Sequence, residues 1–268
     1  MEQVTAALRS QEVWAGRRRR ARHLAGGYPF AGELLRLYEG LLDPQERAFL
    51  SALDDRPDPA TLSDYVAEHV VAAIADATVA AGPAALGAAV RERLREGDPA
   101  GIVAAWLASD PQDPVDEYLA RASAGPVLEA LGPVAGAACA RQAEDGGCPR
   151  CGGQPQVSYL MEAGEALVSG PRMLQCHRCG ESWIHARMTC AACGEQTTAQ
   201  LPIFADAERL PHLRADACQT CRRYVITIDL RKDAEAIPIV DELIALPLDL
   251  DMRERGFAKI VPNLMAIG

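Results

Sequence analysis

The sequence predicts an α+β protein with an all-α N-terminal domain, two tandem cysteine-rich modules and a C-terminal helix. Three observations support this fold class. As far as residue 145, apolar residues recur every three or four positions, the spacing of amphipathic helices. Eight of the nine cysteines then lie in four Cys-x-x-Cys pairs. Short apolar runs follow these pairs, as is typical of strands. The predicted boundaries are 1–145 for the helical domain, 146–188 for the first module, 189–232 for the second module, and 233–268 for the C-terminal helix and tail.

Asp-Pro pairs mark the expected helix starts in the N-terminal domain, because aspartate is a favourable N-cap and proline fits the first helical turn. Between the second and third pair, a further helix is expected to end at Gly97. The opening segment, 11–41, predicts two helices broken at 26–29, where two glycines precede Tyr28 and Pro29. The Asp-Pro pairs are Asp43-Pro44, Asp58-Pro59, Asp98-Pro99 and Asp113-Pro114.

Two of these helices have further features. After Asp58-Pro59 a long helix is expected, and Pro126 and Pro133 are expected to kink or split the helix that follows Asp113-Pro114. The residues expected along one face of the long helix are Leu62, Val66, Val70, Ile74 and Ala77.

The N-terminal domain shows no metal-ligand or phosphate-binding pattern. Its densest charge is the run 17–20 together with Arg22, for which a solvated helix face is favoured over a docking patch. His23 and His69 are isolated and are interpreted as surface or core residues. Cys139 has no partner at ligand spacing and is interpreted as a small buried side chain.

The four cysteine pairs predict two metal sites. The two residues inside each pair form a tight turn that directs both thiolates at one metal, and a tetrahedral site needs two such turns. Twenty-four residues separate the first pair from the second and the third from the fourth, which indicates a duplicated module. Glycine follows three pairs, whereas Arg222 follows the fourth, so a less ideal turn is expected there. The expected ligands are Cys148, Cys151, Cys176 and Cys179 for one metal, and Cys190, Cys193, Cys218 and Cys221 for the other.

Two alternatives use the same cysteines. Four disulfides are disfavoured, because the chain is long and its cysteines are confined to one window. A cross-brace, in which the first pair joins the third and the second joins the fourth, is disfavoured because equal spacing makes each module self-sufficient.

The four-sulfur donor set limits the chemistry of these sites. A site closed by four thiolates leaves no position for substrate or water, so metal-assisted hydrolysis is disfavoured and no catalytic residue is predicted. Zinc would make the sites structural zinc ribbons, whereas iron would make them rubredoxin-like and able to pass one electron. Ligand softness does not choose between the two metals. His177 and His185 are not expected to be metal ligands.

Charge and hydropathy restrict the partners. The formal net charge of −10 argues against nucleic acid or an anionic membrane as partner. A nucleic-acid-binding zinc ribbon remains a minor alternative. No apolar run is long enough to span a membrane, and the reduced thiols and the absence of an export signal indicate the cytoplasm.

Strands are expected at 156–160, 182–188 and 224–230, with a turn at 169–171. A C-terminal helix is expected over 240–250, with Pro247 straining its middle. Trp183 and Tyr224 are expected to cover the small core beside each metal. Asp241, Asp249 and Trp183 are weak candidates for partner contact, for which structural roles are favoured.

The chain resembles the formate dehydrogenase accessory protein family, most specifically from Cys148 onward. Arg19, Arg22, Leu24 and Ala25 ahead of Pro29 also fit. The segments that carry the resemblance are Cys148-Pro-Arg-Cys-Gly-Gly-Gln-Pro155, Gly170-Pro-Arg-Met-Leu-Gln-Cys-His-Arg-Cys179, Glu181-Ser-Trp-Ile-His-Ala-Arg187, Cys190-Ala-Ala-Cys193, Cys218-Gln-Thr-Cys221 with Tyr224, Asp241-Glu-Leu-Ile-Ala-Leu-Pro-Leu-Asp249, Gly256-Phe257 and Pro262-Asn263.

The resemblance implies a helical domain joined to two rubredoxin-like metal sites. It implies an accessory factor, not an enzyme, that binds the catalytic subunit of a molybdenum- or tungsten-containing formate dehydrogenase in the cytoplasm during its maturation. It favours two iron ions over zinc. A rubredoxin-like one-electron carrier remains the alternative from a different class.

Overall fold

The computed structural model describes residues 2–140, 146–162 and 170–264, without the side chains of 2–11 and 96. Its contacts divide the chain into two compact units, Met1–Arg141 and Gln142–Gly268. The first unit is helical, and the second contains a sheet with two groups of four cysteines. The predicted α+β fold class is therefore confirmed. In the described parts of the chain, no helix is both long and apolar enough to cross a membrane.

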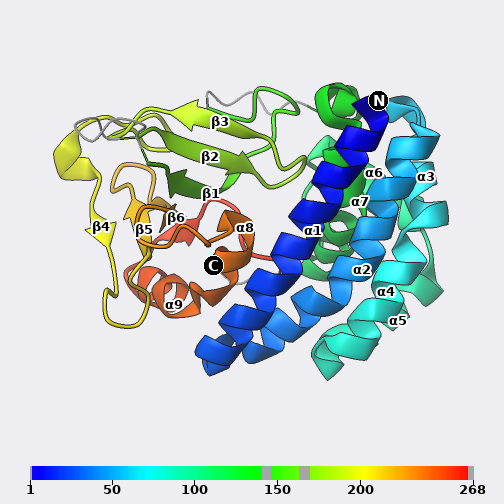
Figure 1. The fold of residues 1–268 in the computed structure, drawn as a ribbon, viewed down its shortest axis with the longest axis horizontal. Coiled ribbons are helices and arrows are strands. Elements are labelled where there is room, and N and C mark those ends of the chain that lie inside the picture. The colour runs from blue at the N-terminus through cyan, green and yellow to red at the C-terminus, as the bar shows by residue number, and fades with distance from the viewer. Residues whose placement is uncertain (1, 141–145, 163–169, 265–268) are drawn as a thin grey trace. The chain divides into compact units, whose positions relative to one another are not determined.

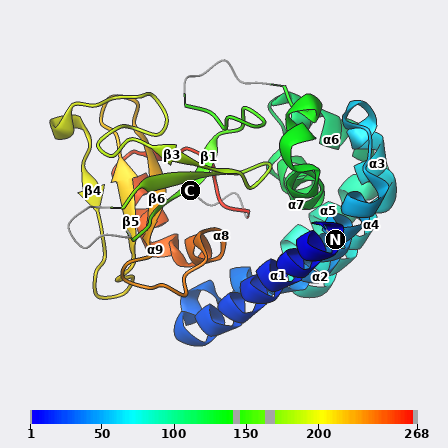
Figure 2. The same ribbon diagram turned by 45° about the horizontal axis from the view of Figure 1, so that its top comes forward.

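The first unit is organised around α2, which packs against α1, α4 and α7. In both ribbon views α1 lies alongside α2 (Figures 1 and 2). Leu35, Leu41 and Leu42 of α2 are fully buried, as are Leu119 and Leu128 of α7. The elements are α1 (Glu2–Gly27), η1 (Pro29–Ala31), α2 (Gly32–Asp55), η2 (Pro59–Thr61), α3 (Leu62–His69), α4 (Val71–Ala81), α5 (Ala84–Glu96), α6 (Pro99–Ala108), α7 (Pro114–Leu131) and η3 (Gly132–Ala138).

Three of the four Asp-Pro pairs begin helical segments as predicted. The side chains of Asp58, Asp98 and Asp113 each accept a hydrogen bond from a backbone N–H of the following turn. The predicted start at Asp43-Pro44 is wrong, because α2 continues through Pro44. The Asp43 carboxylate accepts hydrogen bonds from Arg18 instead of capping a helix. Buried apolar residues on both sides of Pro44 keep this helix continuous.

The predicted long helix after Asp58-Pro59 is wrong in one respect. It is interrupted at Val70, whose φ of −123° lies outside the helical range, so α3 and α4 are separate helices. The break at the two glycines before Tyr28 is confirmed, since α1 ends at Gly27 and the η1 turn follows. Pro126 lies inside α7, and Pro133 lies in the η3 turn beyond it.

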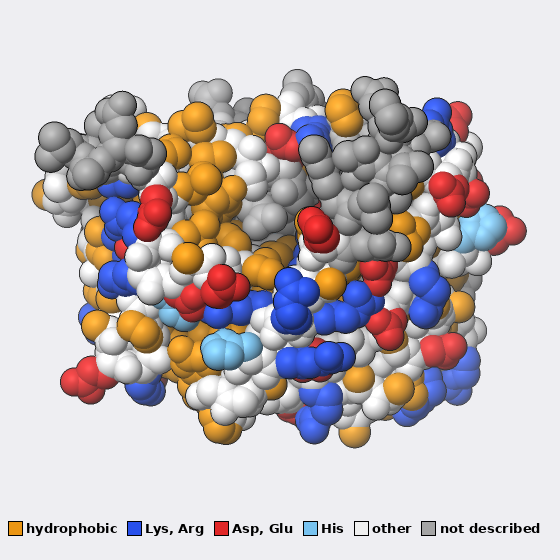
Figure 3. Space-filling model, viewed as in Figure 1, with side chains coloured by type: hydrophobic (Ala, Val, Ile, Leu, Met, Phe, Trp, Pro, Cys, Tyr) orange, Lys and Arg blue, Asp and Glu red, His pale blue; other side chains and the backbone are white. Residues whose placement is uncertain are grey.

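The arginine run on α1 is not a wholly solvated face. Arg17 and Arg20 are 8% and 6% exposed. Arg17 pairs with Glu129 of α7 at 2.8 Å, and its guanidinium lies 4.5 Å from the centre of the Trp14 ring. Other basic side chains do reach the surface over α1 (Figure 3). The run therefore combines an internal α1–α7 contact with a solvated edge.

The second unit is built on one mixed sheet with strand order β3-β2-β1-β6-β5-β4, and β7 pairs with β6. The strands of both modules belong to it, because β1 of the first module pairs in parallel with β6 of the second. All other neighbours on the main path are antiparallel. The elements are β1 (Pro155–Leu160), β2 (Arg172–Cys176), β3 (Ser182–His185), η4 (Thr198–Gln200), β4 (Ile203–Phe204), β5 (Leu213–Ala217), β6 (Arg223–Asp229), α8 (Pro238–Asp241), η5 (Glu242–Ile244), α9 (Leu246–Glu254) and β7 (Ala258–Lys259).

The C-terminal segment differs from the single helix expected over 240–250. It forms α8, η5 and α9, and Pro247 lies in the first turn of α9. Proline is unstrained there because the first turn needs no N–H donor from it. α8 contacts β1 and α9 contacts β5, so these helices pack on the sheet that carries the cysteines (Figure 2).

Candidate metal centres

The first cysteine cluster consists of Cys148, Cys151, Cys176 and Cys179. The four sulfur atoms lie within 4.8 Å of one another, and all four residues are buried. The Sγ atoms of Cys148 and Cys179 are 3.7 Å apart, and those of Cys151 and Cys176 are 3.4 Å apart. The first two cysteines precede β1, and the second two follow from the end of β2.

The second cysteine cluster consists of Cys190, Cys193, Cys218 and Cys221. Its four sulfur atoms also lie within 4.8 Å of one another. This cluster is more open to solvent, since Cys193 is exposed and Cys221 is half-buried. The Sγ atoms of Cys190 and Cys221 are 3.8 Å apart, and those of Cys193 and Cys218 are 3.7 Å apart. Each cluster joins the two pairs of one module, so the thiols have the sequential grouping and not the cross-brace.

All four pairs share one turn geometry. The N–H of the first cysteine donates to the carbonyl five residues later in every pair, for example from Cys148 to Gly153 and from Cys218 to Arg223. The residue after the second cysteine has a positive φ of 74° at Gly152, 67° at Gly180, 74° at Gly194 and 57° at Arg222. The fourth turn therefore forces an arginine into the conformation that glycine adopts without steric cost.

The backbone also directs donors at the sulfurs. The N–H of Arg178 donates to Cys176 Sγ at 3.3 Å, and the N–H of Ala192 donates to Cys190 Sγ at 3.4 Å. Gly153 leaves room beside the first cysteine cluster, because a Cβ there would lie 2.9 Å from Cys176 Sγ. N–H donors stabilise thiolates, and such a contact is typical of metal-bound cysteine turns.

The thiols cannot all ionise in this arrangement without a compensating cation. Contact with the Cys148 and Cys151 thiols, together with burial, raises the pKa of Cys176 and of Cys179. Contact with Cys151 raises the pKa of Cys148, but contacts with Cys176 and Cys179 outweigh it and lower that pKa to about 7. Ionisation of one thiol is thus favoured, and ionisation of its neighbours is disfavoured. A bound divalent cation would stabilise all four thiolates together.

The sulfur separations fit a tetrahedral metal. Four sulfurs bound at about 2.3 Å from one centre lie about 3.8 Å from each other. The four Sγ–Sγ distances given above, 3.4–3.8 Å, are close to this value. None of the nine cysteines is in a disulfide, so the four disulfides considered above are not formed. Both clusters can hold a metal ion, and the donor set suits iron and zinc equally.

Comparison with known proteins connects this geometry to a family. Residues 188–266, which contain the second cysteine cluster, match the family described as FdhE, C-terminal domain. A protein FdhE homolog from Pseudomonas aeruginosa is 30% identical over 96% of this chain and 90% of its own length. The chain belongs to the FdhE family. A protein FdhE homolog from Aquifex aeolicus is 36% identical, but the match covers 44% of this chain and 41% of that protein.

A solved structure extends the similarity to the fold. The crystal structure of the FdhE protein from P. aeruginosa has a TM-score of 0.66 and 28% identity, and the match covers 94% of this chain and 95% of that one. The helical unit and the cysteine-bearing sheet are therefore both features of an FdhE fold.

The histidines near the clusters lie outside them. His177 Nδ1 is 2.9 Å from the carbonyl oxygen of Gln154, and His185 Nε2 is 3.3 Å from that of Thr189. Neither belongs to a sulfur group. Trp183 packs against an apolar cluster that includes Leu174 and Val225, which fits the expected covering role.

Asp241 and Asp249, the weak candidates for partner contact, are 0% and 1% exposed in this FdhE chain. Asp249 accepts hydrogen bonds from Tyr224 at 2.8 Å and from Lys259 at 3.0 Å. Lys259 also pairs with Glu242, and both side chains are fully buried. These acidic groups hold the C-terminal segment on the sheet and present no surface to a partner.

Sequence reasoning missed two groups of residues. His212, Asp233 and Asp241 bring three potential ligand atoms within 4.8 Å, and His212 Nε2 lies 2.8 Å from Asp241 Oδ1. Five arginines also line one pocket of the second unit. Neither group has a local motif, because its members come from segments separated in the chain. Pairing of the strands and packing of α8 on the sheet bring them together.

Proposed function

We propose that this chain is an accessory factor that binds the catalytic subunit of a formate dehydrogenase in the cytoplasm and is needed for the assembly or activation of that enzyme. The carrying observation is the similarity to an FdhE homolog over nearly the whole of both chains. On this proposal the chain does not oxidise formate itself, since a metal closed by four thiolates offers no position for a substrate.

We propose further that the eight clustered cysteines bind two metal ions, one in each cluster. Iron is favoured by the family resemblance, and zinc is the alternative. When bound, the metal supplies charge compensation and a cross-link between two turns. The chain itself supplies four sulfurs per site, the turns that aim them and the N–H donors at Cys176 and Cys190.

The metal assignment is tested by elemental analysis and a visible spectrum of protein purified without oxygen. Two metal ions per chain are expected. Cys193→Ser is expected to reduce the content to one ion, because it removes a ligand of the second cysteine cluster only. Cys139→Ser is the matched control, since Cys139 lies outside both clusters, and its metal content is expected to stay at two. A wild-type content of zero, or equal loss in the two variants, would refute the assignment.

The partner is tested by anaerobic co-expression with an affinity-tagged catalytic subunit of a formate dehydrogenase. Co-purification and a several-fold gain in formate oxidation over cells lacking this chain are expected. A second tagged molybdoenzyme of unrelated substrate serves as the specificity control. Failure to co-purify together with unchanged formate oxidation would refute the proposal.

A second candidate function is a one-electron carrier, which the openness of the second cysteine cluster favours. Cys193 is exposed and Cys221 half-buried, whereas all four cysteines of the first cluster are buried. An iron ion at the open cluster would lie close to solvent and to a redox partner. A visible absorption that bleaches with one electron per open site, and recovers on reoxidation, would support this function. A colourless zinc protein would exclude it.

A further inference from the structure

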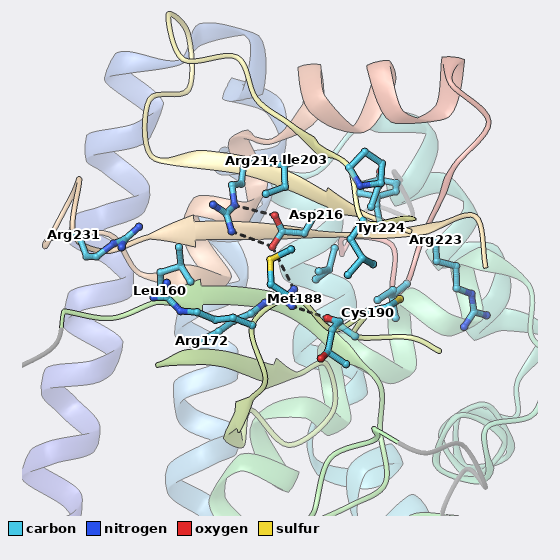
Figure 4. Close-up of a pocket in the computed structure, with 18 residues that line it drawn as sticks. Leu160, Arg172, Met188, Cys190, Ile203, Arg214, Asp216, Arg223, Tyr224 and Arg231 are labelled. Carbon is cyan, nitrogen blue, oxygen red and sulfur yellow. Dashed lines mark hydrogen bonds and ion pairs between the residues drawn. The ribbon is translucent and has the colours of Figure 1, made fainter. Parts of the chain in front are cut away.

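A pocket of about 230 Å³ lies in the second unit, over strands of both modules (Figure 4). Leu160 of β1, Arg172 of β2 and Asp216 of β5 contribute to it. One wall is the segment 187–191, which links the first module to the second. The pocket therefore exists only because the two modules share one sheet.

Arginine dominates the polar lining. Among the described residues that line the pocket, Asp216 is the one acidic side chain, against Arg172, Arg187, Arg214, Arg223 and Arg231. Arg231 is paired with Asp229 at 2.6 Å. Counting that carboxylate too, five positive groups meet two negative ones. This excess of positive charge contrasts with the net charge of −10 for the whole chain.

Asp216 is shared among several donors. Its carboxylate lies 2.8 Å from Arg214 Nε and 3.3 Å from Arg172 Nη2, and it accepts a hydrogen bond of 2.8 Å from Thr227 Oγ1. Figure 4 shows Arg172 and Arg214 converging on Asp216 from two strands. One carboxylate shared by two guanidinium groups leaves positive charge in the pocket.

Arg172 is fixed in place before any ligand arrives. It is 6% exposed, and it donates to Ser158 Oγ and to the carbonyl oxygen of Thr189, each at 2.9 Å. Burial lowers the pKa of Arg172; Asp216 offsets part of this effect, and nearby Arg214 and Arg187 add to it. An anion would relieve the cost of holding these cations close together.

The rest of the lining is apolar. Leu160, Pro202 and Ile260 contribute walls, and Met188 and Ile203 are 48% and 53% exposed large side chains beside them. A concave apolar site with a few convergent charged groups is the usual form of a small-molecule site. Bidentate guanidinium groups match the geometry of carboxylates and phosphates.

We propose that this pocket binds a small organic anion in which a phosphate or carboxylate group is carried on an apolar body. The oxyanion lies against Arg172, Arg187 and Arg214, and the apolar body lies against Leu160 and Ile203. This site is separate in chemistry from the metal centres, although Cys190 lies in the pocket wall.

Binding is tested by calorimetry on the full-length, metal-loaded protein with phenyl phosphate and with benzoate. Phenol and benzyl alcohol are the neutral controls of similar size. At least one anion is expected to bind ten times or more as tightly as its neutral control. The two anions distinguish a phosphate site from a carboxylate site. Failure of both to bind at millimolar concentration, or binding no tighter than the neutral controls, overturns the proposal.

Variants locate the site. Arg187→Gln and Arg214→Gln are each expected to weaken anion binding about tenfold, because each removes a guanidinium donor. Arg187 is exposed and Arg214 half-buried, so the fold is expected to survive, as circular dichroism would verify. Arg209→Gln is the matched control, since Arg209 is an exposed arginine of the second module that pairs with Asp206 outside the pocket.

A charge placed at the exposed apolar edge provides an independent check. Ile203→Glu is expected to weaken anion binding more than Ile203→Gln, which has the same size without the charge. Equal effects of these two variants, or unchanged binding in both arginine variants, would overturn the proposed location.

Discussion

Arg222 is a non-glycine residue in a backbone conformation that favours glycine. Its φ of 57° lies in the same left-handed region as the φ values of 67° to 74° of the three glycines in the equivalent turns. Its guanidinium lies 3.9 Å from the centre of the Phe257 ring and donates to the carbonyl oxygen of Arg255 at 2.5 Å. The side chain thus fastens the C-terminal segment to the fourth cysteine turn and offsets the conformational cost.

Substitution of Arg222 separates these two effects. Arg222→Ala keeps the unfavourable backbone and loses the contacts, whereas Arg222→Gly loses the contacts and relieves the backbone. We expect the glycine variant to be more stable than the alanine variant by about 1 kcal/mol. Chemical unfolding of the two metal-loaded variants measures the difference. An alanine variant at least as stable as the glycine variant would show that the turn is not strained.

Asp249 is predicted to make stability depend on pH. Burial raises its pKa to about 6; Lys259 offsets part of this effect, and Glu242 adds to it. The folded state therefore holds this proton more tightly than the unfolded chain does. The stabilisation that comes from the bound proton is fully present below the unfolded pKa and is lost as the pH rises through 6.

Asp249→Asn removes this titration while keeping an acceptor for Tyr224. When the pH is raised from 5 to 7.5, the free energy of unfolding of the variant minus that of the wild type is expected to increase by about 1 kcal/mol. Unfolding curves at the two pH values measure the change, and comparison at equal pH cancels the contribution of the metals. Parallel pH dependence of the two proteins would contradict the prediction.

At the scale of elements, two Asp-Pro pairs with the same sequence pattern have different roles. Asp98 Oδ1 accepts a hydrogen bond of 2.8 Å from the N–H of Gly101 and begins α6. Asp43 lies in the middle of α2, and its side chain is 69% exposed beside Arg18. Local sequence predicts both aspartates as N-caps. Asp43 is not an N-cap, because buried apolar residues on both sides of Pro44 keep α2 continuous.

We expect Asp98→Ala to destabilise the protein by about 1 kcal/mol through the loss of an N-cap. Asp43→Ala is expected to cost less than about 0.5 kcal/mol, since it removes a largely exposed ion pair. Thermal unfolding of the two variants, monitored at the helical band in circular dichroism, measures the difference. Equal losses would show that the cap at Asp98 contributes no more than the surface pair.

The secondary-structure elements could be predicted from the sequence more completely than the way in which they assemble. Cysteine spacing identified the two groups of four, and apolar periodicity identified the helical unit, because both are local properties. The pairing of β1 with β6, which merges the modules into one sheet, depends on contacts such as that between Val157 and Ile226, which are separated by 68 intervening residues. The arginine pocket depends on that pairing, and the buried Lys259 depends on the pairing of β7 with β6, so no local pattern predicts either.

For the whole molecule, this division predicts how metal loss will act. Structural metal sites contribute about 10–16 kcal/mol, as much as a typical domain has in total. The sheet unit holds both cysteine clusters, whereas the helical unit has its own core around α2 and α7. Removing the metals should therefore unfold the sheet unit and leave the helical unit folded.

Hydrogen exchange measured by mass spectrometry before and after chelation under reducing conditions tests this. Amides of β1, β2, β5 and β6 are expected to lose protection, whereas those of α2 and α7 are expected to keep it. Cys139→Ser is the control, because it changes a cysteine outside the clusters and should respond to chelation as wild type does. Loss of protection in α2 and α7 together with the strands would mean that the two units fold as one cooperative body, and that the metals stabilise the whole chain.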